Sequence, residues 1–407
     1  MKNPPLPFHG FHGVVRAILP CLLGAAASLT HAVEACSVTD AGAVPATCTA
    51  TSAWSGSGEF EPAILSVTSG GQYTQATGLY VYNSNAPGGN TGTRGIYASG
   101  QSAANVASRV EIGAYVPITI HVTNVSNPDD NDGLYVGAGA QVLLHGALNA
   151  ITTTAGDPAY QARAITVGGM GTGPLAATHA TLTVAGTLEA DTTGAATTQE
   201  SIRVADQGEV QANVGGAVKS ARAGIHAYDA GTFASAGSMA VTAGTHAVWV
   251  EGPYASAKPV SQVALNTATL AATASAVVLS SNVASNTTGA VFTQSGGSIT
   301  SDQGSAIVFA SGSGATNVWL QNTTVQSNAP LGPGPDGFAS GLVAYSTAEA
   351  ANLVAINSQL NGHIGIDAPG RLWLSLGNTQ WNTGGDPATA NAISLTGISG
   401  NGTITMP

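Results

Sequence analysis

The four residues Gly224-Ile225-His226-Ala227 show the pattern that decides the fold: a small residue, an aliphatic residue, a variable residue and a second apolar residue. Because side chains alternate between the two faces of a strand, the two apolar residues point inward and the variable residue points outward. We find twelve copies: Gly78-Leu79-Tyr80-Val81, Gly95-Ile96-Tyr97-Ala98, Gly133-Leu134-Tyr135-Val136, Ala164-Ile165-Thr166-Val167, Ser201-Ile202-Arg203-Val204, Gly224-Ile225-His226-Ala227, Ala247-Val248-Trp249-Val250, Ala276-Val277-Val278-Leu279, Ala306-Ile307-Val308-Phe309, Gly341-Leu342-Val343-Ala344, Gly365-Ile366-Asp367-Ala368 and Ala392-Ile393-Ser394-Leu395. Each copy predicts a short strand.

The copies recur roughly every 28 residues on average, a period typical of solenoids and other repeat arrays. A repeat of this length cannot bury an apolar face alone, so neighbouring repeats must stack. Further alternating stretches lie between the copies, at 141–144, 181–190, 238–242, 263–270, 317–320, 353–356 and 372–376. The shortest intervals leave no room for a propeller blade of four strands.

Two or three short strands per repeat, turns rich in Gly, Asn, Ser and Pro, and no helical period predict an all-β fold. We expect a right-handed parallel β-helix of about twelve rungs, roughly 60 Å long at the usual strand spacing. It would occupy residues 61–407 as one domain, with a cap at 33–60.

The N-terminus resembles an export signal over residues 1–32. Lys2 and Arg16 precede an apolar stretch at 17–29, and small residues allow cleavage after Ala32 or Ala35. No other apolar run is long enough to predict a membrane-spanning helix. We therefore expect export across the inner membrane, to the cell surface or the extracellular space, or alternatively to the periplasm.

Cleavage would leave two cysteines, Cys36 and Cys48, in an oxidising compartment. A disulfide between them would close the first end of the stack and stabilise it by about 3 kcal/mol. The alternative is lipidation of Cys36, but Glu34 is a poor residue for such a site.

Composition and motifs argue against several classes of function. Charged residues form only 8% of the chain, with 21 acidic against 10 basic, so phosphate contacts to a nucleic acid have few donors. The scattered histidines and the acidic turn at 127–133, which lacks the final glutamate of a calcium loop, predict no metal site. No nucleophilic triad, phosphate-binding loop or other cofactor motif is present. We expect neither a cofactor nor a nucleic-acid partner.

The variable position of the repeat predicts the outer face of the stack. It reads Tyr80, Tyr97, Tyr135, Thr166, Arg203, His226, Trp249, Val278, Val308, Val343, Asp367 and Ser394. The three tyrosines predict a ladder that contacts a glycan or protein ligand, or that only stacks on itself or lies under a loop. Charge on this face is sparse, whereas a β-helical polysaccharide lyase or hydrolase needs acidic and basic groups on neighbouring rungs.

The end of the chain resembles the passenger domains of pertactin-like autotransporters. The resemblance rests on Leu372-Trp373-Leu374-Ser375-Leu376-Gly377-Asn378-Thr379-Gln380-Trp381-Asn382-Thr383-Gly384-Gly385-Asp386 and on Leu395-Thr396-Gly397-Ile398-Ser399-Gly400-Asn401-Gly402-Thr403-Ile404-Thr405-Met406-Pro407. It implies a non-enzymatic surface protein, an adhesin or virulence-associated protein that binds a host-cell or extracellular protein or glycan.

The chain departs from that family in two ways. The sequence ends at Pro407 without the family's translocator barrel, so we expect a truncated or split passenger or a periplasmic remnant. The Arg-Gly-Asp motif of some members is Arg94-Gly95-Ile96 here. The alternatives are a secreted polysaccharide-active β-helix enzyme and a fragment without activity.

Overall fold

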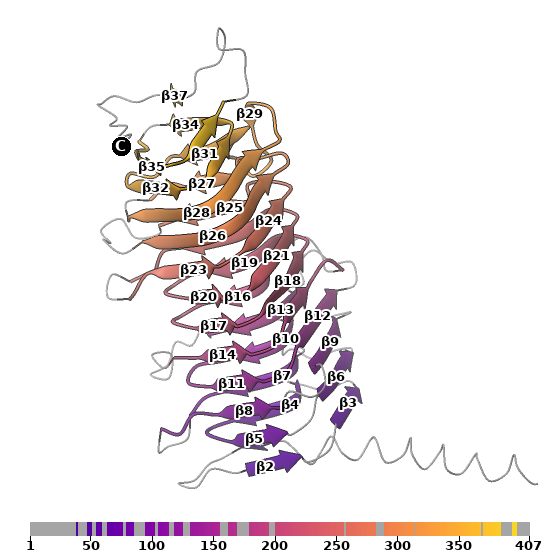
Figure 1. Cartoon of the computed structure of the whole chain (residues 1–407). Helices are drawn as coiled ribbons and strands as arrows, with labels where there is room; N and C mark the ends of the chain where they lie inside the picture. Colours follow the sequence, from indigo (N-terminus) through magenta and orange to yellow (C-terminus); the bar gives the residue numbers. More distant parts are fainter. Residues whose placement is uncertain are drawn as a thin grey trace, which may run out of the picture.

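The computed structural model forms a rod of stacked β-strands, with the N-terminal rungs at one end and the C-terminal rungs at the other (Figure 1). It describes residues 38–39, 47–50, 54–58, 63–75, 79–84, 94–101, 105–113, 118–124, 131–154, 162–168, 179–194, 200–255, 258–281, 289–312, 314–367, 369–383 and 393–396. These residues contain no helix. None of them therefore forms a helix long and apolar enough to cross a membrane.

One side of the rod, which we name the first face, is a parallel sheet of 13 strands. Its members in order are β1 (Val38–Thr39), β4 (Ala63–Thr68), β7 (Arg94–Ser99), β10 (Asn131–Val136), β13 (Ala162–Val167), β16 (Glu200–Val204), β19 (Ala223–Ala227), β22 (His246–Glu251), β25 (Val277–Ser280), β27 (Ile307–Phe309), β31 (Leu342–Ser346), β34 (His363–Asp367) and β37 (Ile393–Thr396). Strands adjacent in this order lie far apart in sequence, so each pair belongs to successive turns of the chain.

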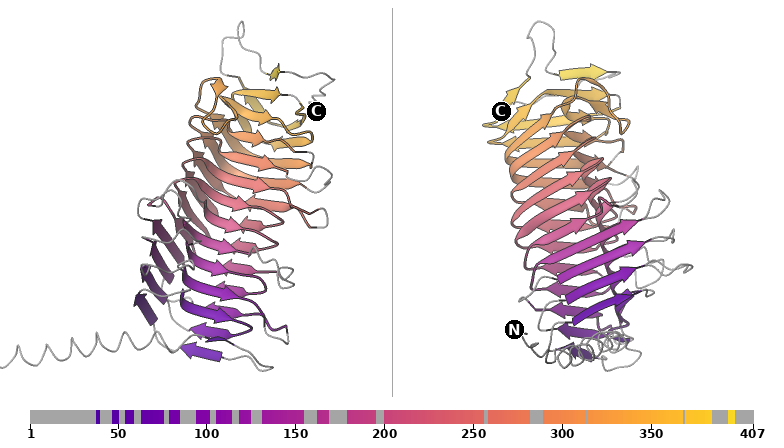
Figure 2. Two further views of the ribbon diagram at one scale, coloured as in Figure 1. Left: turned by 180° about the vertical axis from the view of Figure 1, so that it is seen from behind. Right: turned by 90° about the vertical axis from the view of Figure 1, so that its right-hand side faces the viewer.

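Two further rows of parallel strands complete each rung. The second face holds β2 (Thr47–Ala50), β5 (Gln72–Gln75), β8 (Arg109–Ile112), β11 (Gln141–Leu144), β14 (Thr181–Val184), β17 (Glu209–Ala212), β20 (Thr232–Ser235), β23 (Ser261–Leu265), β32 (Ala351–Ile356) and β35 (Leu372–Gly377). The third face holds β3 (Trp54–Gly58), β6 (Leu79–Ser84), β9 (Ile118–Asn124), β12 (Leu148–Thr154), β15 (Leu188–Asp191), β18 (Gly215–Ser220), β21 (Ser238–Ala243), β24 (Ala268–Ala272), β33 (Gln359–Asn361) and β36 (Gln380–Asn382). The long strands β26 (Ala290–Ser301) and β28 (Thr316–Ser327) run through both faces. The predicted parallel β-helix is confirmed, and Figure 2 shows its strands one above another from two further directions.

The core runs along the axis of the rod and is made of the inward residues of the repeat. Ile96, Leu134, Ile165 and Ile202 occupy one register position on consecutive rungs, and all four are fully buried. Burial of such a side chain contributes about 1.5–3 kcal/mol relative to leaving it in water. Because each rung adds the same kind of contact to its neighbours, stability grows along the rod rung by rung.

The small residue that opens the repeat lies where two rungs approach closely. A Cβ atom added to Gly133 would lie 2.6 Å from the carbonyl oxygen of Ala164 on the next rung, and one added to Gly224 would lie 2.7 Å from that of Ala247. Such distances are shorter than real contacts allow. A bulky residue at this position would push neighbouring rungs apart, which explains why the repeat begins with a small residue.

Three details of the predicted repeat were wrong. The copy at Gly78 lies in β6 on the third face, and Leu65 of β4 takes its place beside Ile96. The copies at 341–344 and 365–368 are misplaced by two residues, since Ala344 and then Ile364 continue the column of Ile307. The pairing of β31 with β34 also shifts register between Leu342 and Ala344. The stretches at 181–190 and 263–270 each hold two strands separated by a corner, where one had been expected.

The first strands extend the stack further toward the N-terminus than the expected boundary at residue 61. β1, β2 and β3 pair in register with β4, β5 and β6, so the segment expected as a cap contributes a rung. Cys48 lies in β2 opposite Tyr73. Cys36 and the expected signal at 1–32 lie outside the described residues.

Candidate functional site

The outward column of the first face is the place where the sequence predicted a ligand. On successive rungs it reads Ser66, Tyr97, Tyr135, Thr166, Arg203, His226, Trp249, Val278, Val308, Tyr345, Gly365 and Ser394. The ladder therefore contains Tyr97 and Tyr135, whereas Tyr80 pairs with Thr119 on the third face. Val343 and Asp367 do not belong to the column, because Tyr345 and Gly365 occupy these two positions.

Tyr97 and Tyr135 stack on each other. Their ring centroids are 5.1 Å apart and their planes differ by 15°. The guanidinium of Arg94 lies 4.8 Å from the centroid of Tyr135 and 5.3 Å from that of Tyr97, within reach of a cation–π attraction. The two rings therefore contact each other directly, an arrangement that both the ligand-contact and the self-stacking alternatives allow.

A second outward column lies three residues earlier on the same strands, and it is charged. Arg94, Asp132, Arg163 and Glu200 follow one another on consecutive rungs, with alternating sign. The Asp132 carboxylate lies 3.3 Å from Arg94 and 4.0 Å from Arg163, and Arg163 Nε donates to Glu200 Oε1 across 3.0 Å. The prediction of a face sparse in charge was therefore wrong, because it considered only one outward residue per rung.

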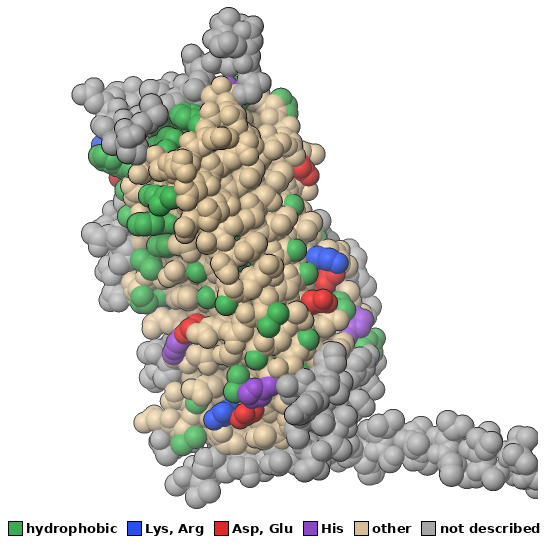
Figure 3. Space-filling view, viewed as in Figure 1, with side chains coloured by type: hydrophobic (Ala, Val, Ile, Leu, Met, Phe, Trp, Pro, Cys, Tyr) green, Lys and Arg blue, Asp and Glu red, His purple; other side chains and the backbone are tan. Residues whose placement is uncertain are grey.

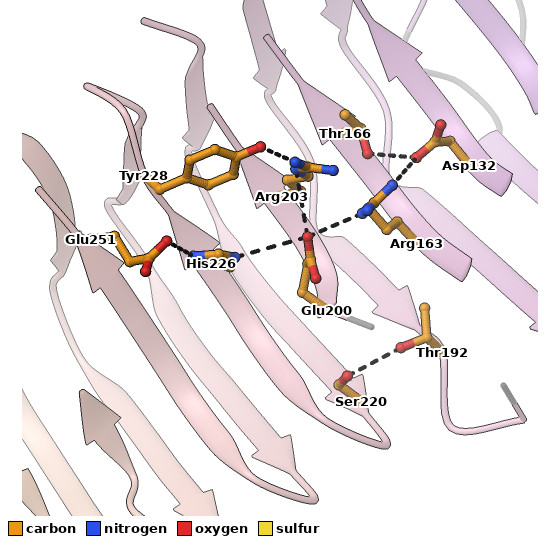
Figure 4. A network of polar contacts seen from close by, with 10 residues as sticks. All are labelled: Asp132, Arg163, Thr166, Thr192, Glu200, Arg203, Ser220, His226, Tyr228 and Glu251. Atoms are coloured by element: carbon orange, nitrogen blue, oxygen red, sulfur yellow. Dashed lines mark hydrogen bonds and ion pairs between the residues drawn. The ribbon is translucent and has the colours of Figure 1, made fainter. Parts of the chain in front are cut away.

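The charged column joins the first column at Glu200 (Figure 4). Arg203 Nε lies 3.6 Å and His226 Nδ1 lies 3.9 Å from Glu200 Oε1. His226 Nε2 lies 3.2 Å from Glu251 on the other side. Arg203 also donates to the hydroxyl of Tyr228, over whose ring its guanidinium lies at 4.9 Å. We name this set the ion-pair network; its members are Asp132, Arg163, Glu200, Arg203, His226, Tyr228 and Glu251.

The ion-pair network is shielded from water. Asp132 is fully buried, Arg163 is 3% exposed and His226 is 8% exposed. The imidazole of His226 stacks on Trp249, with centroids 4.2 Å apart and planes within 7°. Thr166 Oγ1 donates to Asp132 Oδ1 across 2.5 Å. Each buried charge named here therefore has an opposite charge or a hydrogen-bond donor beside it, as buried charges require.

Burial and charge shift the titration of two groups in opposite directions. Burial alone would raise the pKa of Glu200, but the positive charges of Arg163, His226 and Arg203 outweigh it and hold that pKa well below its usual range. Burial alone would lower the pKa of His226, but the carboxylates of Glu200 and Glu251 outweigh it and raise the pKa. The network therefore favours an ionised carboxylate and a protonated imidazole.

The lowered pKa does not suit Glu200 as the general acid of glycoside hydrolysis, although it suits the ionised carboxylate that the same reaction uses as nucleophile or base. A general acid needs a carboxyl group whose pKa is raised, so that it still holds a proton near neutral pH. An imidazole that acts as a base must be unprotonated, which a raised pKa opposes. The alternating charges serve another role well. If one strand of the first face paired with a strand one rung away from its correct neighbour, like charges would lie side by side, and this pairing would be disfavoured.

The aliphatic part of the outward column is covered by the chain itself. Val278, Val308 and Tyr345 pack together with Leu342, and Phe338 and Ala339 close over them. Phe338 and Ala339 belong to the segment that contains the small antiparallel pair β29 (Gly332–Pro333) and β30 (Ala339–Ser340). The loop-covered alternative thus holds for this part of the face.

At the edge of the first face, Lys258 joins two turns. Its Nζ lies 2.8 Å from Asp206 and 2.6 Å from Asp229. Nearby, Tyr254 meets the edge of Tyr228 at 6.1 Å and remains 56% exposed. Alternation along single strands could not predict these contacts, which depend on how long each turn is.

Within the described part of the chain, no three His, Cys, Asp or Glu residues are close enough together to hold a metal ion. No protein-family model, curated protein or solved structure matches this chain.

Proposed function

We propose that this chain is an exported, non-enzymatic binding protein of the pertactin-like passenger type, which presents the sides of its rod to a host-cell or extracellular protein or glycan. The observation that carries the proposal is a separation of chemistry on the surface. The charges of the ion-pair network are paired with one another and buried, while the bulkiest exposed side chains are aromatic. Trp319, Trp373 and Tyr254 are each more than half exposed, at 55%, 54% and 56%.

Exposed aromatic side chains suit binding better than catalysis. A Trp or Tyr ring offers a large rigid surface and a polar group, and such residues contribute much of the affinity of interfaces. A rod adds many such positions along one length of chain, so that a partner can be contacted over several rungs. The export signal and the resemblance of the C-terminal stretch agree with a protein that works outside the cell.

The second candidate is a polysaccharide-active β-helix enzyme. The specific observation in its favour is the ion-pair network itself, because it gathers acidic, basic, imidazole and phenol groups on neighbouring rungs. Against it stand the burial of these groups and the low pKa of Glu200.

One experiment separates the two functions. The full chain is incubated with neutral and uronate-containing polysaccharides, and new reducing ends and unsaturated uronates are measured; in parallel, its retention on host cells, extracellular-matrix proteins and immobilised glycans is measured. We expect retention on at least one of these without cleavage of any polysaccharide. Cleavage that Glu200→Gln or His226→Gln abolishes in a folded variant would establish the enzyme instead.

A further inference from the structure

One part of the surface, near the C-terminal end of the second face, is free of charge over four consecutive strands. The outward residues of β26, β28, β32 and β35 form three columns: Val291, Asn317, Asn352 and Trp373; Thr293, Trp319, Val354 and Ser375; and Ser295, Gln321, Ile356 and Gly377. None carries a charge, although the whole chain has a formal net charge of −11. Figure 3 shows this region as a field of uncharged side chains with hydrophobic groups along one edge.

The exposed apolar groups in this region are large, and polar groups separate them. Trp319 and Trp373 are each more than half exposed, and Ile356 is 42% exposed. The two tryptophans lie two rungs apart and in adjacent columns, so their Cα atoms are separated by about 12 Å at ordinary strand spacing. Two sugar rings of one chain fit this separation, whereas a single small ring spans only one tryptophan.

The same region is hollowed. A shallow cavity of about 170 Å³ is lined by Trp319, Gln321, Val354 and Ile356. Beyond the corner to the third face lies a groove of about 730 Å³, lined by Asn, Thr, Ser and Gln side chains together with Leu376 and Trp381. At this corner Asn322, Asn357 and Asn378 hold left-handed backbone, with φ near 50°. Asn tolerates this conformation, and the corner shapes the groove without a charged side chain.

Hydrogen-bonding groups line both hollows. The side-chain amides of Gln321, Gln359 and Gln380 make no hydrogen bond to any described residue, and each offers donors and an acceptor. In contrast, Asn352 Nδ2 donates to Asn317 Oδ1 across 2.8 Å, and Asn378 Nδ2 donates to Asn357 Oδ1 across 2.8 Å. The rigid amide pairs thus stand beside glutamines that are free to turn toward a ligand.

We infer that this region, which we name the Trp319–Trp373 surface, binds a neutral oligosaccharide; the inference rests on the proposed binding function and names its site and ligand class. Trp319 lines the smaller hollow, and Trp373 lies outside both hollows. Aromatic faces pack on the C–H surfaces of sugars, and amides hydrogen-bond their hydroxyls. A charged glycan would bring ions to a surface with no opposite charge to meet them, which costs desolvation energy. A protein partner needs a larger continuous apolar core than three separated side chains supply.

Binding of the full chain to immobilised neutral fragments of mannan, dextran and β-glucan, and to acidic fragments of hyaluronan and polygalacturonate, tests the inference. We expect binding to at least one neutral glycan, with affinity lowered about tenfold or more in Trp319→Ala and in Trp373→Ala. Gln321→Leu should lower it severalfold. Leu331→Ala is the control, since Leu331 is 61% exposed but lies outside the three columns and outside both hollows, and it should leave the affinity unchanged.

The outcomes distinguish a failure of the Trp319–Trp373 surface as a glycan site from a failure of the proposed function. The glycan site is overturned if the chain is retained on cells or proteins but binds no neutral glycan, or if neither Trp substitution changes its glycan binding. Either outcome leaves the proposed binding function in place. Cleavage of a polysaccharide without stable retention on any surface overturns both. Circular dichroism that matches the parent chain shows that each variant is folded, as expected for substitutions of exposed side chains.

Discussion

Arg163 donates a hydrogen bond to Glu200 across 3.0 Å while its guanidinium also lies 4.0 Å from Asp132. Three rungs of the first face are joined by this one side chain, which is almost completely buried. If it is removed, Glu200 loses its nearest positive partner and Asp132 keeps only Arg94, in a place where water cannot replace the lost charge. We expect Arg163→Met to lower the free energy of unfolding by about 3–5 kcal/mol, the usual effect of breaking a buried pair on one side.

Urea unfolding measured by circular dichroism checks this value, with Arg109→Met as the control. Arg109 donates to Glu111 across 2.9 Å, but its side chain is 46% exposed. An exposed pair contributes only about 0–1 kcal/mol. Equal losses in the two variants would contradict a special role for the ion-pair network.

The relationship between Arg163 and Glu200 also shows how far the sequence reaches. Alternation along each strand predicted that the aliphatic residue beside Arg203 or His226 points inward, and Ile202 and Ile225 are fully buried as this local rule requires. The rule fails at Leu342, which packs in the outer cluster while Val343 lies in the core. Which residues of two rungs lie opposite each other depends on the turns between them, and these vary in length. At two rungs the predicted register was wrong, because Ala344 and Ile364, each two residues from the predicted anchor, continue the column of Ile307.

The candidate site was predictable only in part for the same reason. Tyr97 and Tyr135 were correctly placed as neighbours, but Tyr80 was assigned to the wrong face. The charged column could have been found from the residue three positions before each variable residue, where Arg94, Asp132 and Arg163 alternate in sign. The Trp319–Trp373 surface had no comparable signal, since it combines three columns over four rungs with a corner.

His226 is expected to make the stability of the chain depend on pH. Its pKa is raised from 6.5, so the folded state holds a proton that the unfolded state releases first. The stabilisation by His226 is complete below pH 6.5 and is lost as the pH rises through the folded value. The difference in unfolding free energy between the parent chain and His226→Gln should therefore shrink from about pH 5.5 to pH 8.5.

His246 provides a control of opposite sign. Burial lowers its pKa from 6.5, so in acid the unfolded state takes up the proton more readily and stability is lost as the pH falls. His246→Gln should remove that loss and gain stability relative to the parent below pH 6.5. Unfolding curves at a series of pH values measure both differences; the same trend in the two variants would refute the assignment of the pKa directions.

Tyr97 and Tyr135 are expected to be energetically coupled. A double-mutant cycle with Tyr97→Ala and Tyr135→Ala should give a coupling energy of about 0.5–1.5 kcal/mol, the value for a stacked aromatic pair. The same cycle between Tyr97 and Tyr80 should give about zero, because Tyr80 lies on a different face. Coupling of similar size in both cycles would restore the three-residue ladder predicted from the sequence.

Export is expected to remove the N-terminal segment. Intact mass after expression in a Gram-negative host should show a chain that begins at Val33 or Cys36, as cleavage after Ala32 or Ala35 predicts. Cell fractionation should place this shortened chain outside the cytoplasm. An unprocessed chain that stays in the cytoplasm would exclude the export signal.

Cys36 and Cys48 are expected to form a disulfide once the chain has left the cytoplasm. In the denatured, unreduced protein neither cysteine should then react with a thiol label, and both should react after reduction. Cys36→Ser with Cys48→Ser should lower the free energy of unfolding by about 3 kcal/mol, because the cross-link restricts the unfolded chain near the first rungs.

Labelling of both cysteines without reduction would contradict the disulfide, and a mass increase from lipid at Cys36 would support the alternative modification. Cys48 lies in β2, which pairs with β5, so loss of the cross-link should destabilise the first rungs most. Faster hydrogen exchange of the backbone amides of β2 and β5 in the double variant measures this effect.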